Sequence, residues 1–321
     1  MLWVPKRLRA PSILIVLLSL ASLIAAARRS ATGPDCSRAA TSVERAICTT
    51  PELRAADAAM ANAYSALKAA LPRAQQSALL VDQRDWIGRR DSTCAGRNDR
   101  DLVDCLLAEI DKRRRFLAGE GPNRSSDAPR LRPVFFQGTR EKAFYINVVY
   151  PRIPDPRSQS ESDFNKAAQS FVPEALADAL EDAKLRKEEW ATGLEPGYYN
   201  ASYEVSYLDP RLASVIFTVQ RYMAGDTRPA SRSYSTSLNF DLSHGRELSM
   251  ADIVSSPAHA VHAIAGKCNS DAVGALEHWT LDKDGVSIRF NDEPYSFGFD
   301  CRLSWADLSP WLKPGGPLPP R

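Results

Sequence analysis

The stretch "QRDWIGRRDSTC", residues 83–94, decides how the first part of the chain is interpreted. A large apolar side chain, Trp86, stands among five charged residues, and the run ends at Cys94. Gln83, Trp86 and Arg90 recur at the three- and four-residue spacing of a single helix face, which predicts that all three point inward. A cysteine at the end of such a helix is either a crosslink or a metal ligand, and the compartment decides between these interpretations.

The first residues indicate export. "MLWVPKRLRAPSILIVLLSLASLIAAARRS" begins with positive charge, continues with an apolar run of about 15 residues, and ends in small residues. This pattern predicts a signal peptide at residues 1–27, cleaved near Ala26–Ala27, and a periplasmic or secreted bacterial protein. A membrane span needs about 20 apolar residues. The alternative is an uncleaved N-terminal helix that anchors the chain, which Arg28 and Arg29 would favour.

All six cysteines follow this segment, and an even number in an oxidising compartment predicts a disulfide framework. We favour the pairs Cys36–Cys48, Cys94–Cys105 and Cys268–Cys301. The first four cysteines permit three pairings, and spacing alone does not choose among them. The chain contains no CxxC pair and four histidines, which argues against a zinc site. We therefore expect no metal and no cofactor.

Other chemical motifs are weak. His259 and His262 are three residues apart on a predicted helix, but a third metal ligand would have to come from the distant Asp271 or Glu277. A solvated helix face is the favoured interpretation. His244 precedes a glycine and is expected at a turn surface. The nucleophile-elbow and HExxH patterns are absent, while a Ser/His/Asp triad is neither supported nor excluded. We predict no catalytic residue and a protein that is not an enzyme.

Apolar periodicity predicts two domains of different class. Residues 28–120 carry helical stripes joined by short connections, which predicts a small antiparallel bundle with a short extra helix near Ser42–Cys48. Residues 121–132 have the composition of a linker. Residues 133–312 alternate as strands around a long helical segment, which predicts a mostly antiparallel sheet with packed helices. Residues 313–321 are expected to be a flexible tail. The fold class is α + (α+β).

The charges divide unevenly. Residues 28–120 contain 16 Lys and Arg against 13 Asp and Glu, whereas residues 133–321 contain 19 against 25. The acidic second half favours cationic partners and argues against nucleic acid. Membrane attachment is expected only if the signal segment stays uncleaved.

The first half resembles the lysozyme inhibitor LprI-like N-terminal domain. The resemblance rests on "DCSRAATSVERAIC", "PELRAADAAMANAYSAL" and "QRDWIGRRDSTC" and covers residues 35–117. The residues that match the family pattern, beyond the cysteines, are Asp35, Glu44, Leu53, Asp57, Tyr64, Gln83, Trp86 and Arg90. The second half is similar to the ectodomain of the anti-sigma factor RsiV, which also occurs beside certain peptidoglycan deacetylases. "FDLSHGRELSMADI" and "LDKDGVSIRF" carry that resemblance, and Cys268 and Cys301 have no place in it.

The two resemblances together imply envelope biology, with lysozyme binding in some members of both families and no catalytic residue in either. Trp86, Gln83 and Arg90 could form a recognition patch, but their shared inward stripe favours a structural role in which Arg90 pairs with Asp57 or Glu44. The first functional hypothesis is inhibition of a cationic, lysozyme-like muramidase. The alternative is a peptidoglycan-binding module, since "RSYSTSLNF" offers a polar strand face suited to sugars. A peptidoglycan-modifying enzyme is the least favoured reading.

Overall fold

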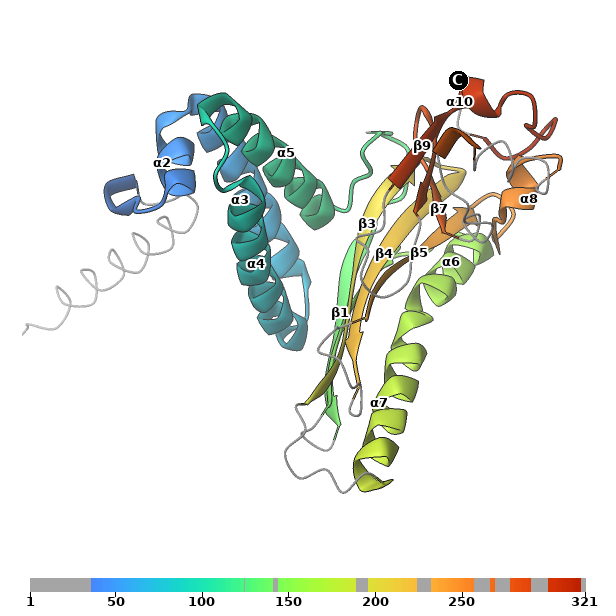
Figure 1. Cartoon of the computed structure of the whole chain (residues 1–321), viewed down its shortest axis with the longest axis horizontal. Coiled ribbons are helices and arrows are strands. Elements are labelled where there is room, and N and C mark those ends of the chain that lie inside the picture. Colours follow the sequence, from blue (N-terminus) through green and yellow to red (C-terminus); the bar gives the residue numbers. More distant parts are fainter. Residues whose placement is uncertain are drawn as a thin grey trace, which may run out of the picture. The chain divides into compact units, whose positions relative to one another are not determined.

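The computed structural model describes residues 36–123, 125–140, 144–188, 196–223, 232–256, 266–268, 278–289 and 300–318. Two compact units emerge within the described residues. The helical unit contains residues 36–66 and 86–114, and the sheet unit contains residues 67–85 and 115–318. The chain is helical at first and then forms a mixed sheet with packed helices, so the predicted α + (α+β) class is confirmed. Figure 1 shows both parts.

Residues 36–118 form one short 3₁₀ turn and four helices. Their bounds are η1 Cys36–Arg38, α2 Ser42–Thr49, α3 Pro51–Ala70, α4 Arg73–Cys94 and α5 Asp99–Ala118. Local sequence explains the ends. Thr41 caps α2 through its hydroxyl, Pro51 opens α3, and Pro72 separates α3 from α4. Gly96, at φ 74°, turns the chain after α4, and the Asn98 side chain accepts a hydrogen bond from the first turn of α5.

Three disulfides close short loops. Cys36 bonds to Cys48 and Cys94 to Cys105, which are the pairs favoured from the sequence. The first ties η1 to α2, and the second ties the end of α4 to α5. The third joins Cys268 to Cys301. In a bundle this small, each of the first two bonds is worth about 2–4 kcal/mol.

The large sheet has six strands in sequence order. They are β1 Arg132–Arg140, β2 Phe144–Arg152, β3 Gly197–Leu208, β4 Leu212–Tyr222, β5 Arg232–Asp241 and β6 Arg246–Glu247. Every neighbouring pair is antiparallel except β2–β3, which is parallel. A parallel pair needs a crossover connection, and the helical segment between β2 and β3 supplies it. β1 was not anticipated from the sequence.

The crossover consists of two helices where the sequence predicted one. α6 spans Gln159–Gln169 and α7 spans Phe171–Glu188, with Ser170 at the break. Pro173 explains the break, because it has no N–H to donate back to residue 169 and its ring is tolerated only in a first helical turn. α7 runs along one side of the sheet in Figure 1.

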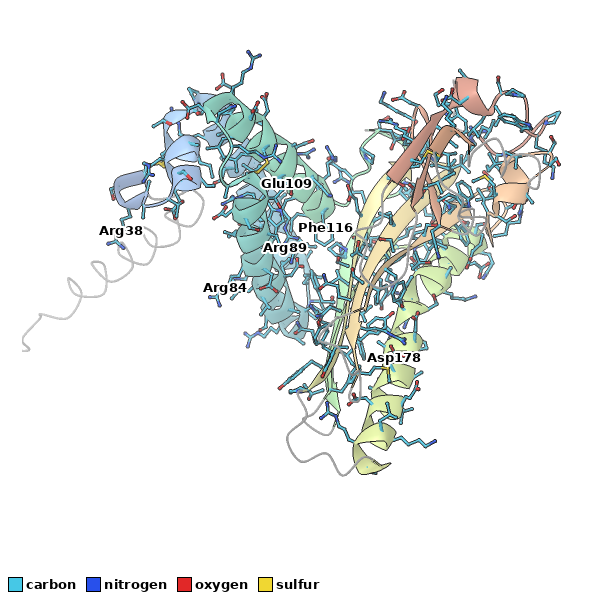
Figure 2. The ribbon with its side chains drawn as sticks, in the orientation of Figure 1. Arg38, Arg84, Arg89, Glu109, Phe116 and Asp178 are labelled. Atoms are coloured by element: carbon cyan, nitrogen blue, oxygen red, sulfur yellow. A yellow bond between two sulfur atoms is a disulfide. The ribbon has the colours of Figure 1, made fainter. Side chains whose placement is uncertain are left out.

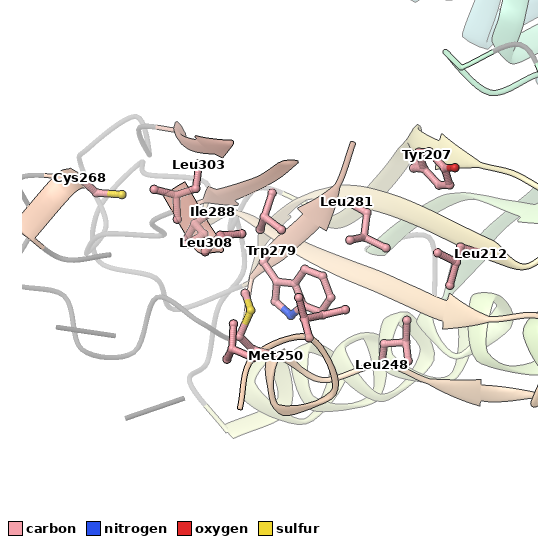
Figure 3. Packing of buried hydrophobic residues seen from close by; sticks show 13 residues of the cluster. Tyr207, Leu212, Leu248, Met250, Cys268, Trp279, Leu281, Ile288, Leu303 and Leu308 are labelled. Atoms are coloured by element: carbon pink, nitrogen blue, oxygen red, sulfur yellow. The ribbon is translucent and has the colours of Figure 1, made fainter. Parts of the chain in front are cut away.

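A three-stranded sheet covers one end of the large sheet. It is formed by β7 Trp279–Leu281, β8 Gly285–Arg289 and β9 Asp300–Ser304, with the short helices α8 Met250–Ile253 and α10 Trp305–Leu308 beside it. Its apolar side chains form one buried cluster centred on Trp279 (Figure 3). Two buried hydrogen bonds join the sheets: Asn239 Nδ2 donates to the Trp279 carbonyl at 2.7 Å, and the Leu281 N–H donates to Ser214 Oγ at 2.9 Å.

Two segments expected to be a linker and a tail make specific contacts. Asn123 pairs with the backbone of Leu208 through both amide atoms, at 2.7 and 3.0 Å. Within residues 313–318, Lys313 N–H donates to the Ile253 carbonyl, and Leu318 packs against the Trp279 cluster. Residues 313–318 therefore contact the sheet unit through the backbone of Lys313 and the apolar side chain of Leu318.

Candidate functional site

Most of the family-motif side chains lie on the inner faces of α3 and α4. Leu53 and Asp57 on α3, and Gln83, Trp86 and Arg90 on α4, are all buried. The guanidinium carbons of Arg90 and Arg113 lie 5.0 and 5.6 Å from the Trp86 ring centroid. Trp86 therefore contacts cations from two helices, an attraction worth about 0.5–2 kcal/mol for each.

Arg90 is held by two carboxylates. Its NH2 and Nε atoms lie 2.7 and 2.8 Å from Asp91 Oδ1, while its NH1 atom lies 4.0 Å from Asp57 Oδ1. Burial raises the pKa of Asp57, and the positive charge of Arg90 opposes that rise. The sequence offered Asp57 or Glu44 as the partner of Arg90; Asp57 lies near it, and the nearer Asp91, adjacent in the chain, was missed. This arrangement holds α3 against α4, and both Asp57 and Arg90 are buried in it.

The remaining motif residues lie apart from Arg90. Glu44 occupies the first turn of α2, where its carboxylate accepts hydrogen bonds from the Ala40 and Thr41 N–H groups at 2.8 and 2.9 Å. The bond from Thr41, followed by that from Ala40, holds the pKa of Glu44 below its ordinary value. Glu44 is thus a capping residue for α2. Tyr64 is half-buried on α3, and Asp35 lies outside the described residues.

The outer face of α4 carries three exposed apolar side chains. Leu80, Val81 and Ile87 are exposed by 38, 46 and 39%. Arg84 projects from the same helix (Figure 2). Gly88 follows Ile87 in the middle of the helix, where glycine costs about 1 kcal/mol relative to alanine. A Cβ at this position would meet nothing within 4 Å, so packing within the chain does not require glycine here.

We expect the Gly88→Ala substitution to raise the free energy of unfolding by about 0.5–1 kcal/mol, because a good helix former replaces glycine in open space. Urea unfolding followed by circular dichroism measures the change. Gly285→Ala is the contrasting control, since a methyl group there would collide with the Leu303 carbonyl oxygen and must destabilise. Unchanged or lower stability in Gly88→Ala would contradict the open environment of residue 88.

Polar side chains hold α7 to the large sheet. Asp178 faces the sheet (Figure 2), and Arg221 NH1 lies 3.1 Å from its carboxylate. Tyr234 Oη donates to Glu174 at 2.7 Å. Burial first, and then this bond, raise the pKa of Tyr234 to about 12. Burial also raises the pKa of Asp178, against the effect of Arg221 and with the help of Glu174. These contacts link one helix to strands β4 and β5 and account for part of the acidic charge of the second half.

The opposite face of the sheet carries two rows of polar and aromatic side chains. Directly paired residues of neighbouring strands place their side chains on the same face. One set of pairs crosses β1 to β4 as an amide row, formed by Gln137, Asn147, Asn200 and Gln220. The adjacent set is a tyrosine row, formed by Thr139, Tyr145, Tyr198 and Tyr222. We call the two rows together the amide–tyrosine face.

This face is accessible in all four strands. Gln137, Thr139 and Gln220 are exposed, Tyr145 is exposed by 49%, and the other members are half-buried. The rings of Tyr198 and Tyr222 lie 6.0 Å apart with planes inclined by 29°. The sequence hypothesis placed a polar, sugar-compatible face on β5 alone. It missed these rows because their members lie up to 85 residues apart and meet only through the register of four strands.

The histidine candidates do not assemble into a described metal site. His244 lies in the turn before β6, where its Nδ1 atom is 2.7 Å from Asp241 Oδ2, and Gly245 adopts φ 69°. His259, His262, Asp271 and Glu277 lie outside the described residues. Within the part of the chain that is described, no group of three metal-ligating side chains occurs. In that same part, no helix has both the length and the hydrophobicity of a bilayer span.

Comparison with known proteins separates the two parts of the chain. Residues 36–117 match the family model of the lysozyme inhibitor LprI. This LprI match runs from η1 into the last turn of α5. It includes the buried Trp86 with its two arginine contacts and both disulfides of the helical region. It ends before β1. No curated protein matches the chain.

Two solved structures show a distant likeness to the chain. One is a DUF3298 family member from Bacteroides fragilis, with 17% identity, TM-score 0.42, and coverage of 59% of this chain and 96% of that one. The other is a DUF3298 family protein from Pseudomonas aeruginosa PAO1, with 14% identity, TM-score 0.42, and coverage of 61% and 99%. These matches do not confirm the RsiV-like resemblance of residues 133–312.

Proposed function

We propose that this protein is an exported, non-catalytic envelope protein that binds and inhibits a lysozyme-like muramidase. The observation that carries the proposal is the LprI match of residues 36–117, a family named for lysozyme inhibition. Three disulfides suit an oxidising compartment, such as the periplasm or the exterior. Cleavage near Ala26–Ala27 would release a mature protein of residues 28–321; in the alternative, the uncleaved segment would hold the chain at the membrane. We keep residues 28–120 as the proposed LprI-like domain and residues 133–312 as the proposed RsiV-like domain.

Within the matched span, the outer face of α4 is the best candidate for contact with the muramidase. Ile87 exposes an apolar side chain, and the adjacent Gly88 leaves the helix backbone open to close approach. A glycine that costs helix stability and serves no internal packing is understandable where a partner must come near the backbone. Inhibition would be steric: a helix face seated at the glycan cleft excludes the substrate.

Charge supports the choice of partner. The second half carries 25 Asp and Glu against 19 Lys and Arg, and a cationic enzyme would be steered toward it. Such steering acts mainly on the association rate and weakens with salt. If the affinity for a cationic lysozyme did not change with salt, the electrostatic steering would be rejected. The proposed contact through α4 would not be affected by that result.

The main experiment measures lysis of a Gram-positive cell suspension by hen-type lysozyme, with and without the oxidised mature protein. We expect lysis to slow in proportion to the amount of inhibitor added. The intact disulfides are verified by mass spectrometry before the assay. Unimpeded lysis at saturating, fully oxidised protein would reject the inhibitor function.

A pair of variants locates the contact. Gly88→Gln places a long side chain on the α4 face and, because glutamine is a good helix former, should fold at least as stably as the wild type. We expect it to inhibit at least about ten-fold less, the effect of losing roughly 1.4 kcal/mol of binding. Leu180→Gln on α7, which replaces a residue exposed by 51%, is the matched control and should inhibit normally. Full inhibition by Gly88→Gln would show that the muramidase does not contact this face of α4.

The alternative function is that of a peptidoglycan-binding envelope module. The amide–tyrosine face favours it, because that face offers neutral hydrogen-bonding groups, the exposed ring of Tyr145 and the half-buried rings of Tyr198 and Tyr222. We further propose that the chain is not an enzyme, since the matched family is named for inhibition. Hydrolysis of purified sacculi by the protein alone would contradict that proposal.

A further inference from the structure

The amide–tyrosine face has a composition that folding does not explain. Asparagine is depleted in strands, and side-chain amides contribute little to sheet packing. Here four neighbouring strands each place one amide in the same row, although a different residue at each position would preserve the register. One contact lies within the row, from Gln137 Nε2 to Asn147 Oδ1 at 3.5 Å. Each amide has two N–H donors and an acceptor oxygen, so most of this capacity is left over for other partners.

The face is chemically distinct from the other side of the same sheet. On the α7 side, side chains such as Arg221 and Tyr234 are engaged by carboxylates of the helix. On the amide–tyrosine face, the eight members of the two rows carry no charge at neutral pH. A polyanion such as a nucleic acid requires Lys or Arg along its track, and the rows provide none. A charged peptide would likewise find no counter-charge in them.

With polyanions and charged peptides excluded, the face suits a neutral ligand. Such a ligand would both donate and accept hydrogen bonds and would present flat apolar patches. Sugars fit this description, since a pyranose ring offers C–H groups to an aromatic face and hydroxyls to amides. An acetamido substituent matches a side-chain amide in both donor and acceptor. Strands lie about 4.8 Å apart, so a row that crosses four strands extends about 14 Å. That length suits a chain of several sugars rather than a single one.

We propose that the amide–tyrosine face binds the glycan strand of peptidoglycan, with sugar rings against Tyr145, Tyr198 and Tyr222 and acetamido groups on the amide row. This site is independent of muramidase inhibition, because it lies outside the LprI match and requires no lysozyme. A protein with both activities would hold its inhibitor at the polymer that the muramidase attacks.

The test is co-sedimentation of the oxidised mature protein with purified sacculi, in the absence of any muramidase. We expect wild type and Tyr145→Phe to pellet, because both keep the aromatic ring. Tyr145→Ala and Gln220→Ala should each bind about five-fold more weakly, the effect of losing roughly one ring or amide contact. Both side chains are on the surface, and matching urea midpoints would verify that the variants fold. Leu176→Ala, exposed on α7, is the control and should pellet like the wild type.

Chemically de-N-acetylated sacculi test the role of the amide row and should capture less protein. Wild type that stays in the supernatant would overturn the proposal, as would equal binding by all variants. Undiminished capture by de-N-acetylated sacculi would overturn the assignment of acetamido groups to the amide row. The protein can bind sacculi without slowing lysis, or slow lysis without binding sacculi. The two assays therefore test glycan binding and muramidase inhibition separately.

Discussion

Replacing Arg90 with alanine is expected to lower the free energy of unfolding by about 3 kcal/mol. The guanidinium lies near the buried Asp57 and packs against the Trp86 ring, so its removal leaves a buried carboxylate without its nearest cation. Breaking a buried charge pair by removing one partner costs about 3–5 kcal/mol. Urea unfolding at pH 7 measures the loss. Arg84→Ala, on the exposed side of the same helix, is the control and should change stability by less than about 0.5 kcal/mol.

The cost should depend on pH. Burial raises the pKa of Asp57 above 3.8 in the folded state, so the folded protein binds this proton more readily than the unfolded chain. Stability contributed by Asp57 therefore falls as pH rises through the window that begins near 3.8 and ends above the folded pKa. In Arg90→Ala the positive charge that opposes the rise in the Asp57 pKa is gone. The pKa of Asp57 therefore rises further, and the pH window extends to higher pH. The difference between variant and wild type should shrink between pH 7 and pH 5.

A double variant separates charge from packing. Asp57→Asn combined with Arg90→Met removes both charges while retaining most of the side-chain volume, and it should lie much closer to the wild type than Arg90→Ala does. If the single and double variants were equally unstable at both pH values, loss of packing against Trp86 would explain the effect, and the ion-pair account would be wrong.

Trp279→Ala is expected to cost about 3–5 kcal/mol, the range for truncating a fully buried large aromatic side chain. Trp279 is 2% exposed and lies in the cluster that joins β7–β9 to α8 and α10 (Figure 3). Hydrogen exchange followed by mass spectrometry should show faster exchange in β7, β8 and β9, with α2 and residues 99–114 of α5 unchanged because they belong to the helical unit. Trp311→Ala, which removes a partly buried tryptophan from the edge of the same cluster, should have a smaller effect. Equal effects would contradict a cluster centred on Trp279.

Local features could be predicted from the sequence, and features that depend on register could not. The sequence favoured the observed pairs of neighbouring cysteines without deciding between the three possible pairings. The start of α3 at Pro51 and the turn around Lys283–Gly285 depend on short-range geometry. The break at Ser170 was missed because apolar periodicity continues through it. β1 was missed although Phe135 and Phe136 are apolar, because the strand is recognisable mainly by its partner β2.

The candidate sites follow the same division. The inward orientation of Trp86 and Arg90 could be predicted from helix periodicity, since both lie on one helix. The open space around Gly88 depends on how the described helices pack, and the amide–tyrosine face depends on three strand registers at once. No single strand reveals that face: "YYN" at Tyr198–Asn200 becomes informative only beside Tyr145 and Tyr222.

The disulfide pattern bears on how the chain matures. Each bond joins cysteines that are consecutive in the sequence, the first with the second, the third with the fourth and the fifth with the sixth. When a chain crosses a membrane N-terminus first, an oxidase that couples thiols in their order of emergence makes all three native bonds directly. An oxidase alone, without a disulfide isomerase, should therefore suffice to mature this protein.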